Sequence, residues 1–246
     1  MQLSPAAYHW ITRMGEIGIL WPAAIVLALW MLRVGGSSRL ALGWLLPLGA
    51  ATIVTSVSKI AFLGWGYGIA ALDFTGFSGH AMFSAAIYPV LAHALAGRHQ
   101  ALAEGGDATP PRRSWRDAAV PAGYAFALLI AYSRVVVHAH SWSEAISGFC
   151  LGAVASGCTL YLARRRATGP ARPAWRWGLC GLAAWLAFMP SHAGPTQTHG
   201  AVTALSIRLA GRQHPFTRAD LHAAERRRPP PTGLSNPANP LHRGPA

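Results

Sequence analysis

Long apolar runs separated by short polar connections dominate this chain. Runs of roughly bilayer-spanning length cover residues 17–32, 40–63, 80–96, 118–137 and 145–163, and a shorter run covers 177–189. A helix of about 20 predominantly apolar residues crosses the hydrocarbon core of a bilayer. The pattern therefore predicts an all-α, polytopic transmembrane bundle of about five to six helices.

The composition supports a membrane protein. Of the 246 residues, 52% are hydrophobic and 12% are charged, which would leave a soluble globule of this length short of polar surface. The net charge is +13, but the arginines cluster between apolar runs. That arrangement is typical of cytoplasmic loops rather than of a nucleic-acid-binding face. We therefore expect membrane lipids, and no nucleic acid, as partners.

The chain divides into three predicted parts. Residues 1–190 are expected to form the membrane-embedded domain, whose first run is a retained anchor because it lacks a clear signal-peptide cleavage site. Residues 191–228 are expected to be interfacial or loosely helical, and the proline-rich residues 229–246 to be a disordered tail.

The cysteines and tryptophans are expected to have structural roles. The cysteines lie inside apolar runs without paired extracellular spacing, which predicts small core residues rather than a disulfide framework; they are Cys150, Cys158 and Cys180. Several tryptophans lie near the ends of runs and are expected to be interfacial anchors; they are Trp10, Trp21, Trp30, Trp44, Trp65 and Trp142.

The distribution of arginine predicts the topology, because cytoplasmic loops retain positive charge. One set of alternate connections carries Arg33, Arg39, Arg98, Arg112, Arg113, Arg116, Arg164, Arg165, Arg166, Arg172 and Arg176. The opposite side receives only Arg13, Lys59 and Arg134 before the C-terminal region. We expect a multi-pass protein of the bacterial inner membrane whose polar motifs face the periplasm, with the side of the tail left open.

The first polar motif surrounds His80. Ser78 can cap the helix that follows, so that the amides of Gly79 and His80 point outward at its positive end, where an anion binds readily. Lys59 is the only lysine of the chain, and it lies in the last turn of the preceding run, on the same predicted side. Such groups in a membrane segment usually have a functional reason.

The second polar motif surrounds His140. Glu144 follows four residues later, so the two side chains share one face near the start of a helix. The carboxylate can accept the proton of one imidazole nitrogen and leave the other free to attack. Arg134 adds a planar donor group suited to phosphate oxygens. Together the two motifs favour a phosphoryl-transfer site.

These residues resemble a known family, the type 2 phosphatidic acid phosphatases or PAP2 membrane phosphatases. The family signature is a lysine followed after six residues by Arg-Pro, then Pro-Ser-Gly-His, then Ser-Arg with a histidine and an aspartate beyond it. The matching residues are Lys59, then Ser78, Gly79 and His80, then Ser133, Arg134, His140 and Glu144. The resemblance covers residues 59–148.

The chain departs from the family signature at three places. Gly66 and Tyr67 stand where Arg-Pro is expected, Phe77 replaces proline, and Glu144 replaces aspartate. The missing arginine removes a charge-assisted hydrogen bond worth roughly 1.5–3 kcal/mol. The longer carboxylate side chain requires the imidazole to shift or the helix to adjust. Neither change removes the nucleophile.

The resemblance implies a role for each matching residue. His140 would become a phosphohistidine, Glu144 would orient it, and His80 would protonate the leaving oxygen. The phosphate would be held by Lys59, Ser78, Gly79 and Arg134, with no metal or other cofactor. The substrate would be a lipid phosphate or lipid diphosphate, and the residues do not choose between phosphatidic acid, phosphatidylglycerol phosphate and polyprenyl diphosphates.

Two other functions fit part of the pattern. Gly76-Phe77-Ser78-Gly79 also matches the Gly-x-Ser-Gly of rhomboid intramembrane proteases, in which Ser78 would be the nucleophile and His140 its base. That interpretation leaves Lys59, Arg134 and Glu144 unexplained. Alternatively, the same cations could hold an anionic lipid headgroup in a protein without catalytic activity.

Overall fold

The computed structural model describes residues 4–34, 38–103, 114–164, seven positions between 181 and 189, and 198–227. Its helices are α1 (Pro5–Arg13), α2 (Ile17–Val34), α3 (Ser38–Trp65), the 3-10 turn η1 (Ala70–Leu72), α4 (Gly79–Ala103), α5 (Ser114–Val136), α6 (Trp142–Arg164), α8 (Thr198–Ala210) and α9 (Arg218–Arg226). The only extended pairing in the described residues is an isolated bridge between Ile69 and Phe74. The predicted all-α bundle is confirmed.

Within the part of the chain that the structure describes, four helical stretches are long and apolar enough to cross a membrane by length and composition. They are Pro5–Leu32, Ser38–Trp65, Ala118–Val136 and Trp142–Ala163. The predicted third run forms α4, which is not among these four. Residues 81–91 of α4 are all buried, and the helix packs against α2, α3, α5 and α6. Because other helices enclose it, the composition of α4 need not suit lipid contact.

The predicted sixth run lies partly outside the described residues. At its described positions, Leu182 and Leu186 are buried, and the indole of Trp185 donates a hydrogen bond of 3.2 Å to the carbonyl of Ile19 in α2. Residues 229–246, predicted to be a disordered tail, lie entirely outside the described residues.

Glycines bring α5 and α6 close to α4. A Cβ atom on Gly123 of α5 would lie 2.7 Å from the Cα of Pro89, and one on Gly152 of α6 would collide with the carbonyl of Met82. At Gly148 of α6, a Cβ would lie 2.5 Å from the carbonyl oxygen of Ser78. Small residues at helix interfaces allow such close backbone approach in membrane bundles.

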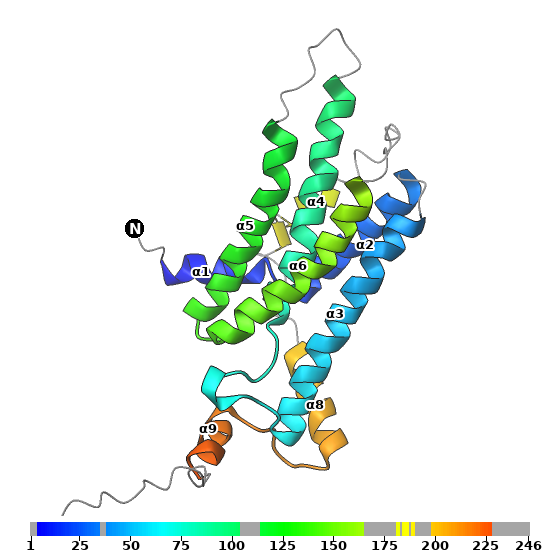
Figure 1. Ribbon diagram of the computed structural model, residues 1–246. Coiled ribbons are helices and arrows are strands. Elements are labelled where there is room, and N and C mark those ends of the chain that lie inside the picture. The colour runs from blue at the N-terminus through cyan, green and yellow to red at the C-terminus, as the bar shows by residue number, and fades with distance from the viewer. Residues whose placement is uncertain are drawn as a thin grey trace, which may run out of the picture.

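The bundle has two distinct ends (Figure 1). The long helices α4 and α5 project toward one end, whereas the loop between α3 and α4, together with α8 and α9, lies at the other. Hydrogen bonds join His140, Glu144 and Thr75 at this second end. Hence the two polar motifs meet at one end of the bundle, as their alternation along the chain predicts.

The structure contradicts the expectations for one tryptophan and two cysteines. Trp44, expected as an interfacial anchor, is fully buried, and its indole donates a hydrogen bond of 3.1 Å to the carbonyl of Ala86 in α4. Cys150 and Cys158, expected in the core, are exposed on α6. In both cases the position along the apolar run says nothing about which face of the helix meets a neighbour.

The contact at Gly123 leads to a stability prediction. Replacing glycine by alanine in a helix adds about 1 kcal/mol of helix propensity, but Gly123→Ala also forces α5 away from the backbone of Pro89. We expect Gly123→Ala to lower the free energy of unfolding by about 1–3 kcal/mol. Unfolding in detergent would be followed by helical circular dichroism.

Gly157→Ala is the matched control, since a Cβ at this position of α6 meets nothing within 4 Å. It should be neutral or slightly stabilising. Equal stability of the two variants would contradict the proposed close approach of α5 and α4.

Candidate active site

The centre of the site is a hydrogen bond between His140 and Glu144. His140 lies in the turn before α6, and Glu144 lies in the first turn of α6. The distance between Nδ1 of His140 and Oε2 of Glu144 is 2.7 Å. Because a carboxylate only accepts hydrogen bonds, Nδ1 of His140 carries the proton, and Nε2 keeps its lone pair. This is the orientation that a nucleophilic imidazole requires.

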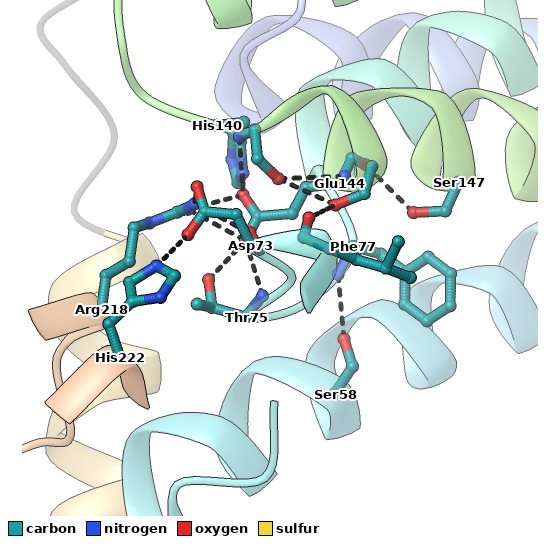
Figure 2. A network of polar contacts seen from close by, with 12 residues as sticks. Ser58, Asp73, Thr75, Phe77, His140, Glu144, Ser147, Arg218 and His222 are labelled. Carbon is teal, nitrogen blue, oxygen red and sulfur yellow. Dashed lines mark hydrogen bonds and ion pairs between the residues drawn. The ribbon is translucent and has the colours of Figure 1, made fainter. Parts of the chain in front are cut away.

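The Glu144 carboxylate is buried and accepts several further hydrogen bonds (Figure 2). Oε1 accepts from the backbone amide of Thr75 at 2.7 Å and from its hydroxyl at 2.5 Å. Oε2 also accepts from the amide of Ser141 at 3.2 Å. Nη2 of Arg218 donates to both oxygens at 3.0 Å. A buried charge needs such partners to be tolerated, and here they fix the plane of the carboxylate.

The first turn of α4 is held against α6 through backbone contacts. The amide of Ser78 donates a hydrogen bond of 3.0 Å to the backbone carbonyl of Glu144. Gly148, one turn later in α6, leaves room for this approach. Ser78 occupies the N-cap position of α4, but its buried hydroxyl has no hydrogen-bond partner among the described residues. Ser78 therefore positions the turn through its backbone and leaves a free hydroxyl.

Lys59 lies beside the glycine turn that precedes α4. A Cβ on Gly79 would be 3.9 Å from Nζ of Lys59, and a Cβ on Gly76 would be 3.3 Å from Cγ of Lys59. Gly76 has a φ of +144°, which a residue with a side chain rarely adopts. The amide of Phe77 donates a hydrogen bond of 3.2 Å to Oγ of Ser58. The turn thus folds back onto the end of α3.

Arg134 and His80 complete the predicted set. Nη1 of Arg134 donates a hydrogen bond of 3.0 Å to the hydroxyl of Thr12 in α1, whereas its buried Nε has no partner in the described part of the chain. His80 packs against the turn between α1 and α2, since a Cβ on Gly15 would lie 3.0 Å from the Cβ of His80. The positive charges of Arg134 and Lys59 act on His80, which also lies near the ring of His140. All the predicted site residues therefore gather at one place.

The surroundings of His140 favour its neutral form. Burial lowers the pKa of the imidazole below its usual value, and the positive charges of Lys59 and Arg134 lower it further, whereas the hydrogen bond to Glu144 opposes the shift. A neutral imidazole that already donates from Nδ1 is ready to attack through Nε2.

Sequence reasoning missed the residues that surround Glu144 on its outer side. Thr75 and Asp73 come from the loop between α3 and α4, and Arg218 and His222 come from α9. Arg218 is one of many arginines and lies 74 residues beyond Glu144. Thr217 and Asp220 form a capping box at the start of α9. This local pattern predicts a helix, but it does not predict that the helix packs beside Glu144.

Phe216 packs against Gly66, the position at which the family signature has arginine. Gly66 has a φ of +75°, and a Cβ there would lie 3.1 Å from the ring of Phe216. A side chain at this position would be strained and would displace Phe216. The structure thus explains why glycine stands at this position, where the signature has arginine.

The rhomboid interpretation lacks its catalytic pair. The hydroxyl of Ser78 makes no hydrogen bond to His140 or to any other described residue.

Comparison with known proteins agrees with this geometry. The model of the PAP2 superfamily matches residues 6–168 of the chain. The chain is also 35% identical over 215 residues to an uncharacterized 22.5 kDa protein in the cps region of Klebsiella pneumoniae, covering 86% of this chain and 96% of that protein. No solved structure shows significant similarity to the chain. The matched region includes every predicted site residue, and the chain therefore belongs to the PAP2 superfamily.

Proposed function

We propose that the protein is an integral membrane phosphatase that hydrolyses a lipid phosphate or lipid diphosphate through a phosphohistidine. The observation that carries this proposal is the hydrogen bond from Nδ1 of His140 to Glu144, which leaves Nε2 free beside the cations of Lys59 and Arg134. A neutral nucleophile, an orienting carboxylate and nearby positive charge are the components that phosphoryl transfer needs.

In the first step, Nε2 of His140 attacks the phosphorus atom and forms a P–N bond. The P–O bond to the lipid breaks, and its electron pair goes to the leaving oxygen. This oxygen takes a proton from His80, whose cationic form is stabilised by the bound phosphate. The imidazole that carries the phosphoryl group keeps its proton on Nδ1, and Glu144 stabilises the resulting positive charge. A lipid alcohol leaves from a phosphomonoester, and a lipid monophosphate leaves from a diphosphate.

In the second step, water attacks the phosphorus atom of the phosphohistidine. Neutral His80 accepts a proton from this water, and the P–N bond breaks with its electron pair returning to His140. Inorganic phosphate leaves, and both histidines regain their starting protonation states. The sequence of steps requires no metal ion.

Free donors at the site support the binding of a phosphate group. The hydroxyl of Ser78 and Nε of Arg134 are buried without partners among the described residues, which is costly unless a ligand satisfies them. Lys59 supplies charge beside Gly79. These groups are the ones to which the family resemblance assigns the phosphate.

The proposed location is the bacterial inner membrane, with the site on the periplasmic side. The four apolar helices support a membrane protein, and the clustering of arginine in alternate connections along the sequence supports the orientation. The lipid chains would lie along the apolar helix surfaces, and membrane lipids would be the immediate surroundings.

The role of His140 as nucleophile predicts that His140→Ala abolishes phosphate release. The purified protein in detergent would be given phosphatidic acid, phosphatidylglycerol phosphate and a polyprenyl diphosphate, with a chelator present. Release should fall to the uncatalysed background, because the variant lacks the imidazole that forms the phosphohistidine in the proposed mechanism.

His138→Asn is the matched control for this variant. His138 lies two residues earlier in the same turn, is exposed, and has a φ of +55° that asparagine tolerates. It should retain activity. Undiminished activity of His140→Ala would contradict the nucleophile, loss of activity with chelator would contradict metal independence, and phosphate binding without turnover would favour the lipid-binding alternative.

The lowered pKa of His140 predicts the acidic limb of the pH profile. Attack requires the neutral imidazole, so kcat/KM falls as the pH drops through the pKa of His140. Since burial holds this pKa below the usual histidine value of about 6.5, the half-maximal point of the acidic limb should lie below about pH 6.5. A limb at or above this pH would show that another group controls the reaction or that His140 is more exposed to solvent.

The orienting role of Glu144 predicts different effects for two substitutions. Glu144→Ala removes the acceptor of the Nδ1 proton and should lower kcat by about 10²–10⁴-fold, the usual contribution of such proton chemistry. Glu144→Asp keeps a carboxylate and should retain measurable activity. Steady-state kinetics would test both, and wild-type kcat in Glu144→Ala would rule out the orienting role.

A further inference from the structure

We infer that Arg218 is a positioning residue for the reaction, and that α9 supplies it to fix the Glu144 carboxylate behind His140. This inference rests on the proposed function, since it assigns a part in the same site. The family model matches residues 6–168, and α9 lies beyond this matched region.

The contacts of Arg218 carry the inference. Nη2 donates to both carboxylate oxygens of Glu144 at 3.0 Å, and Nη1 donates to the backbone carbonyl of Asp73 at 2.8 Å and to the Asp73 carboxylate. Figure 2 shows the guanidinium lying between these two acidic residues. One planar group therefore joins α6 to the loop between α3 and α4, and such charge-assisted contacts hold geometry strongly.

The position of Arg218 at the start of α9 is itself well fixed. Thr217 caps the helix, and its amide and hydroxyl both donate to the carboxylate of Asp220, at 2.9 and 2.7 Å. His222, one turn further on, forms a hydrogen bond of 2.8 Å with Asp73. These contacts fix the position of the guanidinium. Because the guanidinium bonds both oxygens of Glu144, the rotation of that carboxylate is restricted as well.

The C-terminal segment docks where the family signature loses its arginine. The amide of Phe216 donates a hydrogen bond of 2.9 Å to the carbonyl of Leu63, and its ring packs on Gly66. Gly66 permits this contact because it has no side chain. The glycine that removes one arginine from the signature thus makes room for the segment that carries Arg218.

The second departure from the signature fits the same arrangement. With glutamate at position 144, one carboxylate bonds His140, Thr75 and Arg218 at the same time. Glutamate has more rotamers than the aspartate of the family signature. Arg218 restricts these rotamers by donating hydrogen bonds to both carboxylate oxygens. We therefore infer that Glu144, Gly66 and Arg218 act together: Gly66 makes room for the segment that carries Arg218, and Arg218 fixes the Glu144 carboxylate.

Arg218→Gln and Arg218→Lys test this role through kinetics with the full-length protein. A misplacement near 1 Å can cost on the order of a hundredfold in rate, so we expect Arg218→Gln to lower kcat by about 10–100-fold with KM changed less than about threefold. Arg218→Lys should recover part of kcat because it keeps the charge. A raised KM with unchanged kcat would mean that Arg218 binds substrate, and a raised kcat would mean that α9 is an inhibitory cap; both overturn the inference.

Two further variants separate positioning from folding. Arg226→Ala changes an exposed arginine of the same helix and should leave kcat and thermal stability unchanged. Asp73→Asn should lower kcat in the same direction as Arg218→Gln, and the double variant should be no slower than Arg218→Gln alone, because Asp73 acts through Arg218. Fully multiplicative effects would contradict this coupling, and so would full activity in Arg218→Gln.

A spectroscopic measurement distinguishes failure of this inference from failure of the proposed function. In protein labelled with ¹⁵N-histidine, the neutral His140 ring should be protonated at Nδ1, and Arg218→Gln should give a mixture of tautomers while Arg226→Ala does not. If no substrate releases phosphate, the proposed function fails, but the spectrum still tests positioning. An unchanged Nδ1 signal in Arg218→Gln would overturn the inference.

Discussion

The buried carboxylate of Glu144 is the interaction on which the rest of the site depends. An ionised group away from water must be surrounded by donors, or its burial costs several kcal/mol. Here the donors come from three separate segments: Thr75 in the loop between α3 and α4, His140 and Ser141 in the turn before α6, and Arg218 in α9. Hydrogen bonds to this one charge hold the three segments together, and they orient the ring of His140.

The helices and the inner half of the site could be predicted because their signals are local. A bilayer imposes a length on apolar runs, so the residues of α2, α3, α5 and α6 were identified with small errors at the ends. Helical periodicity places Glu144 beside His140. The alternation of spans brings Lys59, His80 and Arg134 to the same end of the bundle. None of these conclusions requires a contact between distant residues.

The outer half of the site could not be predicted, because its signals are long-range. Nothing in the sequence near Arg218 distinguishes it from other arginines, and its partners lie in segments far earlier in the chain. Trp44 illustrates the same limit in the core, since its burial depends on a hydrogen bond to the carbonyl of Ala86, 42 residues away. In the sequence, Gly66 simply stands where the family signature has arginine. The contact with the ring of Phe216, which is visible only in the structure, explains the glycine.

The late position of α9 in the chain has a consequence for biosynthesis. His140 and Glu144 emerge from the ribosome well before Arg218, and α9 must then reach the end of the bundle where Thr75 and Glu144 already lie. Until it does, the carboxylate lacks the donor that contacts both of its oxygens. The last described helix therefore completes the set of donors around Glu144 only after α2, α3, α5 and α6 have been synthesised.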